Sequence, residues 1–181
     1  MRIVRIALTE VVVPARPGSV ASPEVDHPLH MLSYEGKKGW LVQFDQMTKF
    51  IIQLYTDKDV VGLGEAYRGL PASQMQKIAQ QLIGQNLLEL NWQDLPLPPG
   101  RLYDGFECAM IDALARGHGM PLHALLGGAY RKTVRCSYWS SHRTTADAAR
   151  VAQQAKEAGF DNIKFKCALS DPVVEWCREI Y

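Results

Sequence analysis

The feature that most constrains this fold is a change of rhythm near residue 131. Before it, three strand-like runs are followed by helical stretches, and after it strand and helix alternate to Tyr181. Alternating strands and helices form parallel sheets with right-handed crossovers, and such sheets are normally covered on both faces. Two strands cannot complete one. Because a (β/α)8 barrel takes about 250 residues, residues 131–181 are expected to form only its first quarter, βαβα.

The preceding residues, 1–130, are expected to form an α+β domain of their own. Runs rich in β-branched residues at 2–13, 40–56 and 60–66 favour an antiparallel three-stranded meander. Between the first two runs, residues 14–39 are rich in Pro and Gly and predict a long loop. Long loops within compact domains are often lids or binding loops.

Apolar periodicity and capping residues predict the helices. Asp104 with Glu107 predicts a capping box for one helix, and Thr144 or Thr145 is expected to cap a later one. Asp171 is expected to cap the last. The predicted buried stripes are Met75, Ile78, Ala79 and Leu82, then Ala148, Val151, Ala152 and Ala155, and finally Val173, Trp176, Cys177 and Ile180.

Composition argues against two classes of function. Twenty Lys and Arg against 19 Asp and Glu give a formal net charge of +1, so we expect neither a nucleic-acid nor a membrane partner. No apolar run approaches the ~20 residues of a membrane span, and the first residues alternate like a strand, unlike a signal peptide. The cysteines lack zinc-ligand spacing and are expected to be buried, reduced thiols of a cytoplasmic protein. They are Cys108, Cys136, Cys167 and Cys177.

Residues 134–139 and 162–167 are both strand-like, and the second of these runs is the main candidate for chemistry. Residues i and i+2 of a strand point the same way, so Lys164 and Lys166 would share one face and the apolar side chains the other. Two amines about 6–7 Å apart repel each other as cations, which lowers a lysine pKa and favours a neutral, proton-accepting amine. An exposed edge strand also carries lysines merely to discourage pairing with other edges, and the residues alone leave that alternative open.

Four motifs together resemble the enolase superfamily in its mandelate racemase/muconate lactonizing branch. They are Gly62-Leu63-Gly64-Glu65-Ala66, the Ala-x-x-Asp run from Ala109 to Arg116, the Pro-x-x-x-Leu-Leu-Gly-Gly run from Pro121 to Gly128, and Lys164-Phe165-Lys166. Each motif is weak alone, but their order and spacing cover nearly the whole chain. The resemblance implies an α+β capping domain on a (β/α)8 barrel. It also implies removal of a proton α to a carboxylate, with the enediolate held on Mg²⁺.

Carried over by motif, the resemblance implies that Lys166 is the base and Lys164 its electrostatic partner. Ser140, Ser141 and His142 follow the first barrel strand and would line the pocket mouth, because barrel enzymes work at the carboxyl ends of their strands. A serine contacts substrate there in mandelate racemase-like members. His142 could instead be a solvated loop residue.

On the capping side, the resemblance places Tyr67 and Arg68 where a second loop reaches the site. Arg68 could pair with a substrate carboxylate. The 14–39 loop resembles the specificity lid of the family. Glu65 either pairs within the capping domain or serves the site, and the two interpretations are equally open.

Other residues have plainer interpretations. Asp112 and Arg116, four apart on a helix, are expected to form a structural pair. His27 and His30, on a Pro-containing loop without nearby carboxylates, are expected to be solvated. The Gly127-Gly128 pair reads as a helix stop.

The metal-binding carboxylates that the resemblance implies belong to later strands, so no metal ligand is expected here. Only a longer parent protein is expected to be active, as a Mg²⁺-dependent lyase or isomerase, and the 181 residues alone are expected to be inactive. The polar run 140–143 favours a sugar-acid dehydratase, with a racemase or cycloisomerase as the alternative. A different class is a catalytically inactive fragment that serves only in binding or assembly.

Self-association is also expected. The apolar stripe of the last helix would have no barrel to pack against, and the parent protein is expected to be a homo-oligomer that takes a small carboxylate or sugar-acid substrate.

Overall fold

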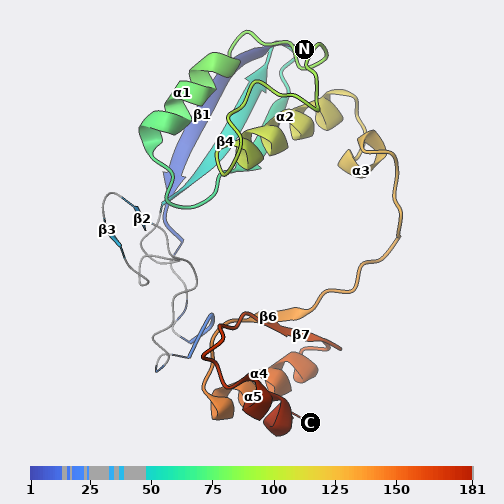
Figure 1. Ribbon diagram of the computed structural model, residues 1–181. Coiled ribbons are helices and arrows are strands. Elements are labelled where there is room, and N and C mark those ends of the chain that lie inside the picture. Colours follow the sequence, from blue (N-terminus) through green and yellow to red (C-terminus); the bar gives the residue numbers. More distant parts are fainter. Residues whose placement is uncertain are drawn as a thin grey trace. The chain divides into compact units, whose positions relative to one another are not determined.

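The computed structural model describes residues 1–13, 16, 18–22, 24, 33–34, 37–38 and 48–180 (Figure 1). The chain divides into two compact units, Met1–Val13 with Gln46–Tyr130, and Pro14–Asp45 with Arg131–Tyr181. The boundary at Tyr130 coincides with the change of sequence rhythm, whereas 14–45 groups with the second unit. The domain bounds 1–130 and 131–181 stay a prediction. Most of the predicted 14–39 loop, with His27 and His30, lies outside the described residues, as does 40–47 of the predicted second strand.

The first unit is an antiparallel sheet with helices on one face. The strands β1 (Ile3–Val11), β4 (Lys49–Thr56) and β5 (Val61–Glu65) pair in the order β1-β4-β5, which confirms the predicted meander. Helices α1 (Ala72–Leu82) and α2 (Tyr103–Gly117) cover the sheet, and α3 (Leu122–Leu125) follows (Figure 1). Alternate residues of β4 are buried in this core, and so is the whole predicted stripe of α1.

Helix α2 lies directly on β5 because glycines leave room for its backbone. A Cβ on Gly62 would lie 2.0 Å from the carbonyl oxygen of Ala109, and one on Gly64 would lie 2.0 Å from that of Gly105. Asp112 stabilises the same contact between α2 and β5. Its Oδ2 accepts hydrogen bonds from the Leu63 N–H at 2.8 Å and from Arg116 Nε at 2.7 Å. The Gly-x-Gly-Glu and Ala-x-x-Asp motifs are therefore two sides of one contact, and the predicted Asp112–Arg116 pair is confirmed.

The capping predictions had mixed outcomes. The predicted box on Asp104 is wrong, because α2 already begins at Tyr103, with Leu102 as N-cap and no side-chain cap bond. Asp104 instead lies in the first turn, where a negative charge favours the helix dipole. Thr144 does cap α4 (Thr145–Glu157), since its Oγ1 accepts from the Asp147 N–H at 3.3 Å.

The second unit contains a two-stranded parallel sheet with its crossover helix. Strands β6 (Tyr138–Ser140) and β7 (Ile163–Phe165) are joined through α4, and α5 (Val173–Ile180) follows. Parallel pairing is confirmed, but β6 is shorter than the predicted 134–139 strand and lies later in the chain. A small antiparallel pair, β2 (Ser33–Tyr34) and β3 (Lys37–Lys38), is also present.

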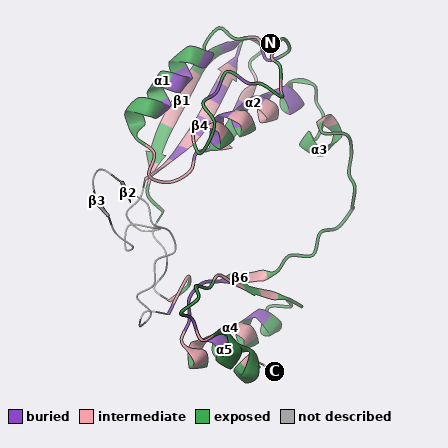
Figure 2. Ribbon diagram, in the orientation of Figure 1, coloured by how far each residue is buried: buried purple, intermediate pink, exposed green. Residues whose placement is uncertain are grey.

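Helices cover one face of this parallel pair. The Trp176 ring, 2% exposed, lies 5.3 Å from the Phe165 ring, and Tyr138 meets Phe160 edge-on at 5.5 Å. Of the two predicted stripes, Ala148, Val151, Ala155 and Trp176 are buried, Ala152 and Ile180 are half-buried, and Val173 and Cys177 are exposed (Figure 2). Trp176 therefore has a packing partner within the unit, and self-association stays a prediction.

The four cysteines are free but exposed, so their predicted burial is wrong. For Cys108 and Cys177 the physical reason is helix geometry, because each lies outside the buried side of its helix. Cys136 and Cys167 lie outside the helices and strands that the structure describes. On α2, for example, Phe106, Ala109, Met110 and Ala113 are buried and Cys108 lies on another side. Within the described ranges, no helix is both long and apolar enough to cross a membrane.

Candidate functional site

The two candidate lysines lie at the carboxyl end of the parallel pair. Lys164 is opposite Trp139 in the register of β6 and β7, and both side chains are exposed while Ile163 and Phe165 are half-buried. This confirms the predicted alternation over Ile163–Phe165 only, because Cys167, which was expected on the buried face, is exposed. Strand β7 ends at Phe165, but the Lys166 N–H still donates to the Ser140 carbonyl at 2.9 Å and carries the pairing one residue further. Lys166 is half-buried.

Ser140, at the end of β6, is fully buried. Its hydroxyl accepts a hydrogen bond from Arg143 Nε at 2.7 Å. In the register, Ser140 lies opposite Phe165, on the face that the helices cover. Its hydroxyl is thus engaged within the unit, and its contact with substrate stays a prediction.

Ser141 differs from Ser140 in what its hydroxyl contacts. Its backbone N–H donates to the Val20 carbonyl at 2.9 Å, but Oγ is buried without a hydrogen-bond partner among the residues the structure describes. A buried hydroxyl without a partner loses its hydration energy and gains nothing in return. Of the two serines, Ser141 therefore has the hydroxyl that a ligand could use.

His142 is not the solvated loop residue that was one alternative. The side chain is 2% exposed, and Nδ1 lies 2.6 Å from Oδ2 of Asp171, whose side chain is equally buried. The same carboxylate oxygen accepts from the Ala168 N–H at 2.6 Å. His142 thereby ties the end of β6 to the loop that precedes α5.

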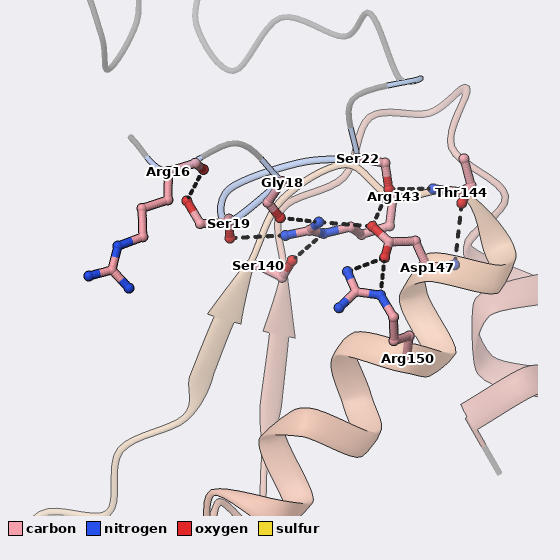
Figure 3. A network of polar contacts seen from close by, with 9 residues as sticks. All are labelled: Arg16, Gly18, Ser19, Ser22, Ser140, Arg143, Thr144, Asp147 and Arg150. Carbon is pink, nitrogen blue, oxygen red and sulfur yellow. Dashed lines mark hydrogen bonds and ion pairs between the residues drawn. The ribbon is translucent and has the colours of Figure 1, made fainter. Parts of the chain in front are cut away.

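A buried charge network beside these residues was missed by sequence reasoning. Arg143, 2% exposed, forms an ion pair with Asp147 at 2.9 Å, and Arg150 binds the other oxygen of Asp147 (Figure 3). The i, i+4 spacing of Arg143 and Asp147 was the available signal. Burial alone would raise the pKa of Asp147. Hydrogen bonds from Ser22, Arg143 and Arg150, with the charge of Arg143, outweigh that effect and hold the pKa below its usual value.

Tyr67 and Arg68 belong to the first unit, whereas the lysines belong to the second. The Arg68 guanidinium carbon lies 5.1 Å from the centre of the Tyr67 ring, and that of Arg101 lies 4.5 Å away. Arg101 was not predicted, since nothing local marks its approach to Tyr67. Glu65, next to this cluster, forms an ion pair with Lys49 within the unit.

Magnesium does not fit the described part of the chain. No three His, Cys, Asp or Glu side chains there come together as metal ligands would. The nearby carboxylates have other partners, because Asp147 binds two arginines and Asp171 binds His142.

No protein-family model matches the chain. Three curated proteins are similar to it. A probable glucarate dehydratase of Streptomyces coelicolor is 25% identical over 70% of this chain and 41% of that protein. A D-xylonate dehydratase of Haloferax volcanii is 28% identical over 64% of this chain and 32% of that protein. A D-Ala-D/L-Ala epimerase of Cytophaga hutchinsonii is 29% identical over 64% of this chain and 35% of that protein. The chain thus spans less than half the length of each.

Solved structures match 99% of the chain and about half of their own length. The L-Ala-D/L-Glu epimerase of Bacillus subtilis matches with a TM-score of 0.71 at 21% identity over 50% of that protein. A mandelate racemase/muconate lactonizing protein of Herpetosiphon aurantiacus matches with 0.71 at 21% over 49%. An enolase of Thermobispora bispora, complexed with magnesium and formate, matches with 0.70 at 20% over 49%. These likenesses show the fold.

Proposed function

We propose that this chain belongs to a longer enzyme that removes a proton α to a carboxylate. Nearly the whole chain is similar to the N-terminal half of enolase-superfamily proteins of the mandelate racemase/muconate lactonizing branch. Residues 131–181 would be the first βαβα of its barrel. One observation carries the proposal: the parallel register puts both lysines at the carboxyl end of β7, where barrel enzymes hold their catalytic groups.

Lys166 is the proposed base. A proton beside a carboxylate is weakly acidic, so the base must be a neutral amine held close to the carbon. Lys164, two residues earlier, adds a positive charge that disfavours a second cation and attracts the developing negative charge of the substrate. The half-buried position of Lys166 limits its exposure to water.

Ser141 and Arg68 are the proposed substrate-binding groups with the most chemical support, together with Tyr67. The Ser141 hydroxyl is buried and lacks a partner among the described residues, and a guanidinium pairs with a carboxylate through two parallel hydrogen bonds. We propose roles for Ser140 and His142 in shaping the pocket, because both are already hydrogen-bonded.

Dehydration of a sugar acid is the proposed reaction, because two of the similar curated proteins carry the names of sugar-acid dehydratases. Epimerisation is the second candidate, supported by the similar epimerases. The longer protein would require Mg²⁺, which is present in the similar Thermobispora bispora structure. Its ligands would come from outside the described residues. A homo-oligomeric state and a cytoplasmic location stay predictions.

Exchange of the substrate's α-proton tests the role of Lys166. The protein that contains this sequence in full is incubated with D-glucarate or D-xylonate in D₂O, and deuterium at the α-carbon is followed by NMR. Lys166→Met is expected to slow incorporation by about 10²–10⁴-fold, the usual contribution of a general base. Lys156→Met, which removes an exposed lysine of α4, serves as the matched control and should leave the rate unchanged. Unchanged exchange in Lys166→Met would contradict the proposal.

We propose that the 181 residues alone are inactive. The alternative that they serve only in binding or assembly also requires inactivity. The same assay with this chain should show no incorporation, whether or not magnesium is added. Deuterium at the α-carbon would show that the chain needs nothing further for proton abstraction.

A further inference from the structure

We propose that Arg143 is a positioning residue. It fixes residues 18–22 against the end of β6 and, through Ser140, holds the backbone at Lys166. The consequence for catalysis rests on the proposed function, whereas the anchoring itself does not.

The Arg143 guanidinium binds two stretches of chain at once. Nη1 donates to the Gly18 carbonyl at 2.7 Å, Nη2 donates to the Ser19 carbonyl at 3.0 Å, and Nε donates to the Ser140 hydroxyl at 2.7 Å (Figure 3). These contacts span 125 residues of sequence. The planar fork of arginine makes such divergent bonds together, and a lysine ammonium cannot reproduce that geometry.

Asp147 makes the burial of this cation tolerable. A buried guanidinium without a counter-charge is strongly destabilising, and Asp147 supplies the charge at 2.9 Å. The Ser22 hydroxyl donates to the same carboxylate oxygen and accepts from the Thr144 N–H at 3.2 Å (Figure 3). Residues 18–22 are therefore attached to both partners of the ion pair.

Backbone hydrogen bonds close the same contact. The Ser22 N–H donates to the His142 carbonyl at 3.0 Å, and the Ser141 N–H donates to the Val20 carbonyl at 2.9 Å. On the other side, the Ser140 carbonyl accepts from the Lys166 N–H at 2.9 Å. A continuous path of contacts thus runs from residues 18–22 through Ser140 to Lys166.

This arrangement gives Arg143 a specific effect on the site. Residues 18–22 lie within the 14–39 segment that the sequence predicts to be a long loop, and the adjoining Ser141 hydroxyl is a proposed ligand group. With residues 18–22 fixed, the end of β6 and the Ser141 hydroxyl are held in one orientation. Without Arg143, the segment loses two carbonyl contacts and Ser140 loses its donor.

Amide hydrogen exchange of the full 181-residue chain, without substrate, tests the anchoring. Arg143→Met should raise exchange at Ser22 and Ser141 about tenfold or more, because several bonds to a charged donor are lost. Lys166 should show a smaller rise, and Val151 in the core of α4 should rise less than Ser22 and Ser141. Arg143→Lys should give an intermediate effect and separates loss of the fork from loss of the charge.

Arg150→Met is the matched control. Arg150 binds the same carboxylate from the same helix, but its side chain is exposed and, within the described part of the chain, its polar contacts run to Asp147 alone. Its loss should change the Ser22 and Ser141 rates by less than about twofold. Unchanged rates in Arg143→Met, or equal rises in Arg150→Met, would overturn the proposal. So would a rise throughout α4 as large as that at Ser22 and Ser141 in both Arg143 variants, since Arg143 would then support the whole unit equally. Failure of the Lys166→Met test would leave this result standing and remove only its catalytic consequence.

Discussion

In the first unit, α2 rests on β5 through backbone atoms and small side chains, whereas in the second unit a buried guanidinium joins distant segments through polar bonds. The first kind of contact depends on shape and tolerates no added atom. The second depends on charge and on the ionisation of Asp147. The two units should therefore fail under different treatments, the first by a small steric change and the second by acid or loss of a charge.

The largest effect is expected from Gly62→Ala in the first unit. The new Cβ would meet the Ala109 carbonyl at 2.0 Å, so the backbone of α2 must move away from β5. We expect a loss of about 3–5 kcal/mol in the free energy of unfolding. Urea unfolding monitored by circular dichroism measures this loss. Leu63→Thr, between the two glycines at an exposed position, is the control and should cost less than about 1 kcal/mol. A Gly62→Ala protein as stable as this control would disprove the close contact.

Asp147→Asn is expected to have the next largest effect, confined to the second unit. It leaves Arg143 buried without its counter-charge, at a cost of about 2–4 kcal/mol. Because the folded-state pKa of Asp147 lies below its unfolded value of about 3.9, the carboxylate stabilises the unit above that value. The stabilisation is lost as pH falls through the folded-state pKa.

The measurement for this prediction is amide exchange at Val151 and Ala155 between pH 5 and pH 2, corrected for intrinsic rates. In the unchanged chain, protection of these amides should decrease as the pH is lowered. In Asp147→Asn, their protection should depend less on pH. Identical pH dependence in the two proteins would show that Asp147 does not stabilise the unit.

The smallest effect is expected from Asp112→Ala, which removes only the polar part of the contact between α2 and β5. The Leu63 N–H and Arg116 lose their shared acceptor, at a cost of about 1–2 kcal/mol in urea unfolding. Arg116→Ala removes only the exposed ion pair and should cost about 0.5 kcal/mol. If both variants lower the free energy of unfolding by the same amount, the hydrogen bond from the Leu63 N–H to Asp112 contributes nothing to stability.

Local patterns predicted much of the first unit because its contacts follow local periodicities. The stripe of α1 and the Asp112–Arg116 pair follow from spacings of three or four residues, and the order of the meander follows the order of its strands along the chain. The four motifs also predicted a resemblance to the mandelate racemase/muconate lactonizing branch, and a solved protein of that name from Herpetosiphon aurantiacus shares the fold.

The rest could not be predicted because it depends on distant partners. Strand β6 extends only as far as its pairing with Ile163–Phe165, which the 134–139 pattern cannot reveal. The Arg143 network needs residues 18–22, more than a hundred positions away. For the site, the alternation at Lys164 was predictable, whereas the engaged Ser140 hydroxyl and the buried His142–Asp171 pair depend on that distant packing.

We propose above that residues 131–181 begin a barrel whose remaining strands carry the metal site. The most direct measurement is the sequence of the coding DNA beyond the codon for Tyr181. We expect an open frame of about 200 further residues, enough for a barrel of about 250, with Asp or Glu at the ends of successive strands. A stop codon directly after Tyr181 would contradict it.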